Sequence, residues 1–500
     1  MILNSKEILN LEKKEIATRE SSFSLMQSAG ENCLKYILNN IEKKKDKKKI
    51  EIIVLVGPGN NGGDGLVIAK KLFEKGINTN IFLIYPIKNK KKDIYKAYKE
   101  IKIKKFSKKN LITKIKSKNN ILIIDCIFGI GLNRKVDLKL KKLITLINNS
   151  KKKIISIDMP SGINSDNGII MGSAIKATET LALHAKKIGH VLYPGSFYSG
   201  KIKVIKIGIK KKFNKYIKSK IIENHPKFWI KNFPFKKTTS HKYSRGKVFI
   251  YGSKINYLGA CLLSSEAALR VGTGSVTIVA NNKTLGLLNK KFFSVLKKNV
   301  NNQDEFYSLL KEEKISSYLI GPGAGTDQNI KILTKLLLKK TKYVVLDADA
   351  LTVFKSSPKN LFSLLDKNKI LTPHFGEFNK IFKNLNNLDN KILKVKMASK
   401  QANAVVVLKG PDTVIASPDG RVCVNTKTTR ELAVIGSGDV LSGIIVSLIG
   451  EGKMNAFDAA CAGVWIHSQS AINQGRGLIA EDIIRGIPSV LNDLYNSNKE

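Results

Sequence analysis

The chain has 500 residues and a formal charge of +48 at pH 7, because 87 lysines and arginines outnumber 39 aspartates and glutamates. This length is too great for one ordinary hydrophobic core and predicts two or three domains. No apolar run approaches the roughly 18 residues of a membrane span, and the N-terminus alternates in charge rather than forming a signal peptide. The five cysteines are scattered without a CxxC pair. We therefore expect a reduced, cytoplasmic protein with no structural disulfide or zinc and no membrane partner.

The positive charge does not by itself predict nucleic-acid binding. Only eight of the basic residues are arginine, and the excess of lysine accompanies many isoleucines and asparagines, which share A/T-rich codons with it. The lysines gather in polar connections such as 43–49, 88–92 and 210–212, as on solvated surfaces. The sequence has no stripe of alternating basic and aromatic residues of the kind that single-strand binders use. We therefore expect no nucleic-acid partner.

Short β-branched runs alternate with helical patterns, such as Leu66–Lys75, along the chain. In the first half the predicted strands are Ile52–Val56, Ile81–Tyr85, Ile121–Asp125, Ile154–Asp158 and Lys203–Ile207. Residues 211–236 have no clear period and are predicted to be a linker. In the second half the predicted strands are Lys247–Tyr251, Ser275–Ala280, Tyr318–Gly321, Tyr343–Asp347, Ile370–Thr372 and Ala404–Leu408. This alternation predicts two α/β domains built on parallel sheets.

The stretch Gly436-Ser437-Gly438-Asp439 is the most informative part of the chain. Its two glycines allow a tight turn that leaves N–H groups free at a predicted helix start, where an anion such as phosphate binds. An aspartate there would repel that anion, which favours Asp439 as a base that activates a hydroxyl for attack on a phosphoryl group. A helix cap formed by Asp439 explains the same residues equally well.

A second glycine-rich turn, Gly57-Pro58-Gly59-Asn60-Asn61-Gly62, follows the first predicted strand and precedes a predicted helix. It contains GxGxxG in the position of a dinucleotide-binding turn. The next strand ends in Tyr85-Pro86 and offers no acidic residue for a ribose hydroxyl, which disfavours an ordinary nicotinamide dehydrogenase. The turn instead carries side-chain oxygens, which come from Asn60, Asn61 and Asp64.

Two further predicted strands end in aspartate. Asp125 is followed by Gly129-Ile130-Gly131, and Asp158 is followed by Pro160-Ser161-Gly162. Because the carboxyl ends of parallel strands meet at one sheet edge, both loops should converge with the glycine-rich turn. Hard oxygen ligands suited to a simple cation would come from Asn61, Asp125 and Ser161. Each aspartate taken singly is also explained as a turn or cap residue.

Together these motifs resemble the NAD(P)H-hydrate epimerase domain over residues 1–210. The resemblance implies that K⁺ is bound by Asn61, Asp125 and Ser161, and that Asp158 contacts the substrate as an acid–base group at the hydrated ring carbon. It also implies that the dinucleotide is held by Asn60, Asn61, Gly62, Gly63, Asp64, Gly129, Ile130, Gly131, Leu132, Asn133, Arg134 and Lys135. Ile130 departs from the family, which usually has threonine between the two glycines.

In the second half, short motifs follow nearly every predicted strand, as a nucleotide site built from loops at one sheet edge requires. They are Gly252-Ser253, Tyr257-x-Gly259-Ala260, Gly321-Pro322-Gly323-Ala324-Gly325, Asp347-Ala348-Asp349, Thr372-Pro373-His374-Phe375-Gly376-Glu377 and Lys409-Gly410-Pro411-Asp412-Thr413. In an extended chain Asp347 and Asp349 would face the same way, toward a Mg²⁺–phosphate pair. His374 is explained equally well as a residue that caps a loop.

In order and spacing these motifs are similar to the ribokinase-like NAD(P)H-hydrate dehydratase domain, over residues 237–495. The resemblance implies that the substrate is contacted by Ala260, Gly325 and His374, with Asp439 at the reacting hydroxyl. It implies that the adenine nucleotide is held by Lys409, Gly410, Pro411, Asp412, Thr413 and Gly438. ADP with Mg²⁺ is the implied phosphoryl donor, with ATP as the alternative. Departures from the family occur at Tyr251, Phe375 and Thr429–Ile435, and the last leaves the donor preference open.

The whole chain thus predicts a bifunctional enzyme of metabolite repair, with an N-terminal Rossmann-like domain and a C-terminal ribokinase-like α/β domain. It would epimerise the R and S hydrates of NADH and NADPH, then dehydrate the S form by phosphorylation and loss of phosphate. We expect a homo-oligomer. The alternative enzyme is a kinase of a small alcohol or vitamin, because the elimination step has no sequence signature of its own. A nucleotide- or RNA-binding scaffold is a further alternative, against which Asp158 and Asp439 argue.

Overall fold

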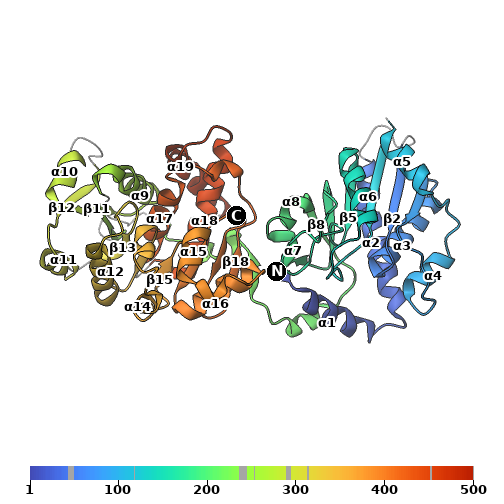
Figure 1. The fold of residues 1–500 in the computed structure, drawn as a ribbon, viewed down its shortest axis with the longest axis horizontal. Coiled ribbons are helices and arrows are strands. Elements are labelled where there is room, and N and C mark those ends of the chain that lie inside the picture. Colours follow the sequence, from blue (N-terminus) through green and yellow to red (C-terminus); the bar gives the residue numbers. More distant parts are fainter. Residues whose placement is uncertain are drawn as a thin grey trace. The chain divides into compact units, whose positions relative to one another are not determined.

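The structure is a computed structural model that describes residues 1–42, 50–117, 119–235, 245–252, 254–288, 294–311, 315–450 and 453–498. The chain divides into two compact units, Met1–Ser219 and Lys220–Glu500. In Figure 1 the first is coloured blue to green and the second green to red.

The first unit is built on a six-stranded parallel sheet with the order β3-β2-β4-β5-β6-β8. Its strands are β2 (Glu51–Val56), β3 (Thr79–Leu83), β4 (Ile121–Cys126), β5 (Lys153–Ile157), β6 (Glu179–Leu183) and β8 (Lys201–Ile205). Residues of β2 are buried on both sides of the strand, because helices cover both faces of the sheet. One face packs against α2 (Ser22–Glu42), α3 (Asn60–Glu74) and α4 (Asp93–Lys99), and the other against α5 (Lys108–Lys116) and α6 (Leu138–Asn149).

The N-terminal segment packs beside this sheet. Strand β1 (Ile2–Leu3) pairs in parallel with β7 (Lys186–Lys187), with Leu3 opposite Lys187. Helix α1 (Ser5–Ile16) then begins at a capping box in which the Asn4 side chain accepts a hydrogen bond from the N–H of Glu7. Two short helices, α7 (Ile188–Val191) and α8 (Gly195–Ser199), lead from β7 to β8.

The second unit is built on a ten-stranded sheet with the order β12-β11-β10-β13-β14-β15-β16-β17-β18-β9. Strands from β12 to β16 are parallel, whereas β17 is antiparallel to both of its neighbours. The strands are β9 (Ile221–Glu223), β10 (Lys247–Tyr251), β11 (Ser275–Ala280), β12 (Leu296–Asn299), β13 (Ile315–Ile320), β14 (Val344–Leu346), β15 (Lys369–Leu371), β16 (Val405–Leu408), β17 (Val414–Ala416) and β18 (Val422–Val424).

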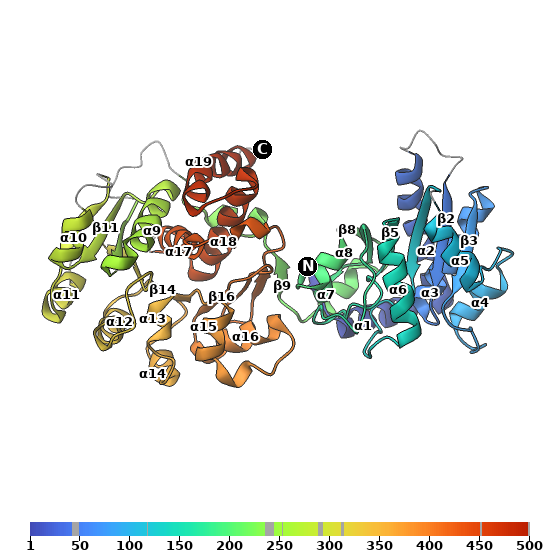
Figure 2. The same cartoon turned by 45° about the horizontal axis from the view of Figure 1, so that its top comes forward.

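Two groups of helices cover the second sheet, and Figure 2 shows them on opposite sides of it. One apolar cluster joins the sheet to α9 (Leu258–Val271), α17 (Ser437–Leu448), α18 (Ala456–Gln474) and α19 (Ala480–Ser497). The other side carries α11 (Gln303–Leu310), α12 (Gln328–Lys340), α13 (Asp349–Thr352), α14 (Pro358–Phe362), α15 (Phe375–Ile381) and α16 (Lys391–Ala402). Helix α10 (Asn282–Leu288) follows β11. Short 3₁₀ helices are η2 (Lys211–Tyr216), η3 (Pro226–Phe228), η4 (Ile230–Asn232), η5 (Ile255–Tyr257), η6 (Lys383–Leu385) and η7 (Arg430–Leu432).

The predicted fold class is confirmed, since each unit is α/β with a largely parallel sheet and every predicted strand is present within two or three residues. The predicted linker 211–236 contains regular structure instead: η2 belongs to the first unit, and β9 pairs with β18 in the second. Residues 236–244, which include the predicted domain start at 237, lie outside the described residues. Within the described chain, no helix has the length and apolar character that a membrane span needs.

Candidate functional sites

The glycine-rich turn of the first unit lies mostly inside a helix. Helix α3 begins at Asn60, six residues before the predicted start, with Gly59 as its N-cap. Glycine allows this close packing, because a Cβ on Gly62 would lie 2.1 Å from the Gly57 carbonyl oxygen and one on Gly65 would lie 2.7 Å from the Cys126 Cβ. The first N–H groups of a helix have no acceptor within the helix, so those at the start of α3 can donate hydrogen bonds to an anionic group.

Asp125, at the end of β4, is fully buried and accepts four hydrogen bonds. The Ser161 hydroxyl and the N–H of Ile127 donate to its Oδ1 at 2.6 and 3.2 Å, and the Ser156 hydroxyl and the N–H of Ser161 donate to its Oδ2 at 2.7 and 2.9 Å. Burial raises the pKa of Asp125, although these hydrogen bonds oppose that shift. The structure thus brings Asp125 and Ser161 together as the sequence predicts.

Asn61 supplies a buried side-chain oxygen. Its Nδ2 donates to the Ile157 carbonyl at 3.1 Å, which fixes the amide. Its Oδ1 is buried, and none of the residues that the structure describes donates a hydrogen bond to it. A buried acceptor of this kind is costly unless a donor or a cation meets it, so the amide fits the cation that the sequence predicts for Asn61, Asp125 and Ser161.

Asp158 follows β5 in a left-handed backbone conformation, with φ of 66°. The ammonium of Lys187 donates to its Oδ1 and to the Leu183 carbonyl at 2.7 Å, and Lys187 is completely buried. The other oxygen, Oδ2, faces the loop that begins at Gly129, since a Cβ on that glycine would lie 2.9 Å away from it. One carboxylate oxygen is therefore fixed by Lys187, while the other is directed toward the predicted dinucleotide loop.

His190 holds the backbone of Asp158. Its Nδ1 accepts a hydrogen bond from the N–H of Lys187 at 2.9 Å, so its Nε2 carries the proton and donates to the Asp158 carbonyl at 2.8 Å. Burial and the Lys187 charge lower the pKa of His190 to about 3, which keeps the ring neutral. The sequence did not identify Lys187 or His190, because no local motif marks either residue.

The predicted dinucleotide loop 129–135 borders a cavity of about 420 Å³. The Ser165 hydroxyl donates to the Ile130 carbonyl at 3.1 Å and fixes the start of the loop. Exposed Arg134 and Lys135 line the cavity together with Tyr85 and Phe128. Two cations and two aromatic rings suit a nucleotide, and the carboxylate of Asp137 lines the same cavity.

In the second unit, Asp439 lies in the first turn of α17. Gly436 adopts φ of 86° as the N-cap, which glycine reaches without strain. The α17 helix packs closely on α9, because a Cβ on Gly443 would lie 2.2 Å from the Ser264 carbonyl oxygen. The Ser264 hydroxyl also donates to the Asp439 carbonyl at 2.9 Å. Asp439 therefore stands at a rigid helix N-terminus, as the sequence predicts.

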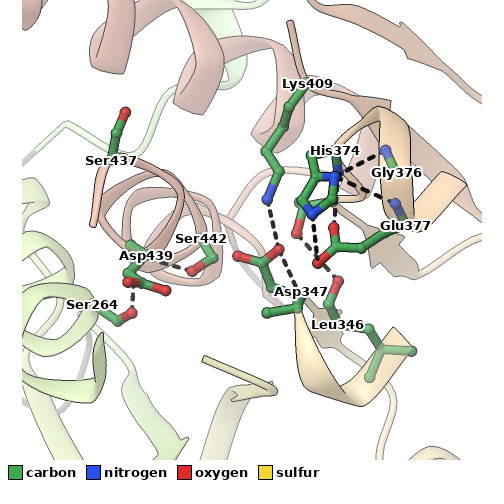
Figure 3. Close-up of polar contacts among 12 residues, drawn as sticks. Ser264, Leu346, Asp347, His374, Gly376, Glu377, Lys409, Ser437, Asp439 and Ser442 are labelled. Atoms are coloured by element: carbon green, nitrogen blue, oxygen red, sulfur yellow. Dashed lines mark hydrogen bonds and ion pairs between the residues drawn. The ribbon is translucent and has the colours of Figure 1, made fainter. Parts of the chain in front are cut away.

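Lys409 and Asp347 lie near Asp439 (Figure 3), and Asp349 also acts electrostatically on it. The ammonium of Lys409 lies 2.8 Å from Oδ1 of Asp347, and it would be 3.3 Å from a Cβ on Gly438. Burial, with added repulsion from Asp347 and Asp349, raises the pKa of Asp439 to about 7, even though Lys409 opposes the shift. Burial lowers the pKa of Lys409, but Asp347 and Glu377 outweigh it and the pKa is raised overall.

Asp347 and Asp349 are not in the extended chain that the sequence suggested. Strand β14 ends at Leu346, Ala348 has φ of 43°, and α13 begins at Asp349. Asp347 therefore binds Lys409, whereas Oδ2 of Asp349 accepts a hydrogen bond from the N–H of Gly325 at 2.8 Å. Both carboxylates still act electrostatically on Asp439.

His374 caps α15. Its Nδ1 accepts hydrogen bonds from the N–H groups of Gly376 and Glu377 at 2.9 and 3.3 Å, and Glu377 closes the capping box. More than half of the His374 side chain is exposed. The capping interpretation is thus what the structure shows, and the exposed ring leaves a substrate contact as a prediction.

The predicted nucleotide segment 409–413 follows β16. Gly410 is exposed with φ of 157°, and Pro411 is exposed beside it. Asp412 is buried, and its Oδ1 pairs with the ammonium of Lys391 at 2.6 Å. The Asp412 carboxylate therefore holds the loop in place rather than facing a ligand. A ligand at this loop would meet mainly its exposed backbone groups. Ala260 is half-buried in the first turn of α9, and Ser253 lies outside the described residues.

His467, which the sequence reasoning missed, supports the start of α17 from α18. Its Nε2 lies 2.9 Å from the Ser437 carbonyl and 3.1 Å from the Ser437 hydroxyl. Burial lowers the pKa of His467 to about 4, so the ring is neutral. The segment before α17 departs from the family pattern, and its last residue, Ile435, is fully exposed.

Fold and site together define a two-domain α/β protein whose second unit presents an aspartate in the first turn of a helix that a glycine caps. The model of the NAD(P)H-hydrate dehydratase family matches residues 248–487, and that of the YjeF-related protein N-terminus matches residues 22–189. A bifunctional NAD(P)H-hydrate repair enzyme of Dictyoglomus turgidum is 32% identical over 527 positions, covering 99% of this chain and 98% of the relative. This chain belongs to the family of bifunctional NAD(P)H-hydrate repair enzymes, which confirms the predicted resemblance.

Two solved structures show similarity to part of this chain. A ribokinase-like superfamily protein from Enterococcus faecalis is 20% identical with a TM-score of 0.49, covering 55% of this chain and 96% of that chain. An ADP/ATP-dependent NAD(P)H-hydrate dehydratase from Bacillus subtilis, co-crystallised with ATP and Mg²⁺, is 23% identical with a TM-score of 0.46, covering 54% of this chain and 98% of that one.

Proposed function

We propose that this chain repairs hydrated NADH and NADPH. The first unit epimerises the R and S hydrates, and the second dehydrates the S form with ADP as phosphoryl donor, regenerating the reduced cofactor. The observation that carries the proposal is the placement of Asp439, with a pKa of about 7, at the glycine-framed start of α17 beside Lys409. Membership of the family of bifunctional NAD(P)H-hydrate repair enzymes supports the same conclusion.

In the second unit, Asp439 acts as the base. It removes the proton from the ring hydroxyl while that oxygen attacks the terminal phosphoryl group of ADP, and the P–O bond to the inner phosphate breaks to release AMP. The N–H groups at Gly436–Gly438 and the Lys409 ammonium are placed to stabilise the phosphoryl charge. Phosphate then leaves with the C–O electron pair as the ring nitrogen donates its lone pair, and loss of a ring proton restores the dihydropyridine. A pKa near 7 suits a base at neutral pH.

Mg²⁺ fits the carboxylates of this second site. Asp347 and Asp349 present hard oxygen atoms near Asp439, and Lys409 offsets part of their charge. Bound there, the ion would neutralise charge on the nucleotide phosphates. Segment 409–413 and Gly438 would hold the adenine nucleotide, and Ala260, Gly325 and His374 would contact the substrate. We propose ADP as the phosphoryl donor, with ATP as the alternative.

In the first unit, Asp158 acts on the hydrated ring carbon with its free Oδ2. The dinucleotide would lie along loop 129–135 and the start of α3, where Arg134, Lys135 and the helix N–H groups meet its phosphates. K⁺ would be held by Asn61, Asp125 and Ser161, and the unpartnered Oδ1 of Asn61 supports this assignment. A bound K⁺ would supply positive charge that anchors the substrate. A cytoplasmic location and a homo-oligomeric state complete the proposal.

The test is recovery of near-ultraviolet absorbance from a mixture of both NADH-hydrate epimers, supplied with K⁺, Mg²⁺ and either ADP or ATP. Full recovery requires both activities, because a dehydratase alone stops once the S epimer is consumed. Recovery that stops there would contradict the epimerase assignment. A stable phosphorylated product, in place of free phosphate and NADH, would instead identify a small-molecule kinase, the alternative that Asp439 also fits.

A further inference from the structure

The N-terminal segment, β1 and α1, packs beside residues of the first site. The pairing of β1 with β7 places Leu3 opposite Lys187, whose ammonium holds Asp158. Ile8 and Leu11 of α1 are buried in a cluster that also includes Ile130 of the predicted dinucleotide loop. The N-terminal segment is thus joined both to the residue that fixes Asp158 and to the loop that Asp158 faces.

Three glutamates of α1 differ in what they contact. Glu7 belongs to the capping box and accepts hydrogen bonds from Ser219. Glu15 accepts hydrogen bonds from the Arg19 guanidinium and the N–H of Lys210. Glu12 lies between them, largely buried, and no hydrogen bond or ion pair joins its carboxyl to any residue that the structure describes. Glu7 and Glu15 therefore anchor α1 through hydrogen bonds, whereas Glu12 does not.

The charges around Glu12 come from three other elements. Asp158 follows β5, Asp64 lies on α3, and Lys187 lies on β7. Burial and repulsion from Asp158 raise the pKa of Glu12 to about 7, while Lys187 acts in the opposite direction. Burial and the charges of Asp158 and Glu12 likewise raise the pKa of Asp64, again opposed by Lys187. Asp158 differs from Glu12 in that the Lys187 ammonium is hydrogen-bonded to its Oδ1.

We propose that Glu12 is the second acid–base group of the first site and works with Asp158 in the interconversion of the R and S hydrates. This inference rests on the proposed epimerase function. Epimerisation by loss and return of water needs two proton-transfer groups, because the hydroxyl leaves one face of the ring and water adds to the other. A single carboxyl beside one face cannot serve both.

The proton transfers balance over the cycle. Protonated Glu12 donates its proton to the leaving hydroxyl, the C–O bond breaks, and the ring nitrogen lone pair forms a C=N⁺ bond as water departs. A water molecule then adds to the opposite face and gives a proton to Asp158. The reverse reaction uses the same groups in exchanged roles, and proton exchange with solvent restores the starting state.

The experiment measures R-to-S exchange of purified NADH hydrate by chromatography, with K⁺ and without nucleotide, so that the second unit is idle. We expect Glu12→Gln to slow exchange by about 10²–10⁴-fold, with KM for the hydrate changed little, and to remove the part of the pH–rate profile centred near pH 7. Glu12→Asp should restore part of the rate. Glu15→Gln, the matched control on the same helix, should lower thermal stability but keep the exchange rate.

The outcomes separate this inference from the proposed function. An unchanged exchange rate in Glu12→Gln, together with loss of exchange in Asp158→Asn, would overturn the role of Glu12 and leave the epimerase intact. Absence of exchange in the unmodified chain would refute the epimerase itself. Equal loss of exchange in Glu12→Gln and Glu15→Gln would mean that α1 acts only as structure, and would overturn the inference.

Discussion

The Lys409 ammonium lies 2.8 Å from the Asp347 carboxylate and also reaches the first turn of α17, where Asp439 is placed. The contact brings together the ends of β14 and β16 and the start of α17, three segments that lie far apart in the sequence. The pair sets the electrostatics of the second site, since Asp347 raises the pKa of Asp439 and Lys409 lowers it.

Replacing Asp439 with asparagine should reduce dehydration of the S hydrate by about 10²–10⁴-fold, because the substrate hydroxyl loses its base. The side chain keeps nearly the same size, so the α17 N-terminus should persist. ADP-dependent NADH formation from purified S epimer measures the effect. R-to-S exchange in the first unit is the internal control and should be unchanged. Undiminished dehydration would disprove the role of Asp439.

Dehydration should increase with pH through about 7, because Asp439 accepts a proton only when ionised. The stability of the folded second unit should decrease over the same pH range. The pKa of Asp439 is raised from 3.8 to about 7 in the folded chain, so the stability this site contributes is fully present below about 3.8 and is lost as pH rises through about 7.

Asp439→Asn should therefore unfold at a higher temperature than the unmodified chain at about pH 8, and at nearly the same temperature at about pH 4. Each kcal/mol corresponds to roughly 2–4 °C in a unit of this size. Thermal unfolding of both proteins at the two pH values, without ligands, is the measurement. A variant less stable at the higher pH would show that Asp439 is not strained by its surroundings.

Replacing Lys409 with methionine should destabilise the second unit by about 3–5 kcal/mol, since Asp347 would remain buried without its cation. The double variant Lys409→Met with Asp347→Asn should recover most of that loss, because the buried charge is also removed. Neither variant should recover dehydration, since the phosphoryl group lacks the ammonium. Chemical denaturation of the three proteins, with the dehydration rate alongside, measures both effects. A double variant no more stable than Lys409→Met would show that the buried Asp347 charge is not what the lysine offsets.

Epimer exchange should depend on K⁺, and Asn61→Ala should raise the K⁺ concentration needed for half-maximal exchange by about 10–100-fold. The reason is that Oδ1 of Asn61 is the buried acceptor left for a cation. Exchange rates are measured against KCl, with LiCl keeping the ionic strength constant. Asn80→Ala is the matched control, because Asn80 is also buried but donates to Glu51 at 3.1 Å. If both variants shift the K⁺ dependence equally, or neither does, Asn61 is not a ligand.

Much of the fold was predictable from local pattern. The β-branched run Ile52–Val56 is buried on both sides, and a continuous apolar run is the signature of a central parallel strand. The strands that the sequence did not reveal, such as β9 and β17, have only three residues each. Their pattern is too short to identify, and their place in the sheet depends on partners far along the chain.

The sequence by itself determined where glycines and aspartates follow strands, and so it located Asp125, Asp158 and Asp439. It did not determine which charges meet them. Lys187 beside Asp158 and Lys409 beside Asp347 are contacts between segments 29 and 62 positions apart. His467 and Glu12 reach their sites from helices that no local motif marks. Only the tertiary structure decided these contacts, because burial and proximity, which set the pKa and the hydrogen-bonding partner of each group, arise when the elements pack together.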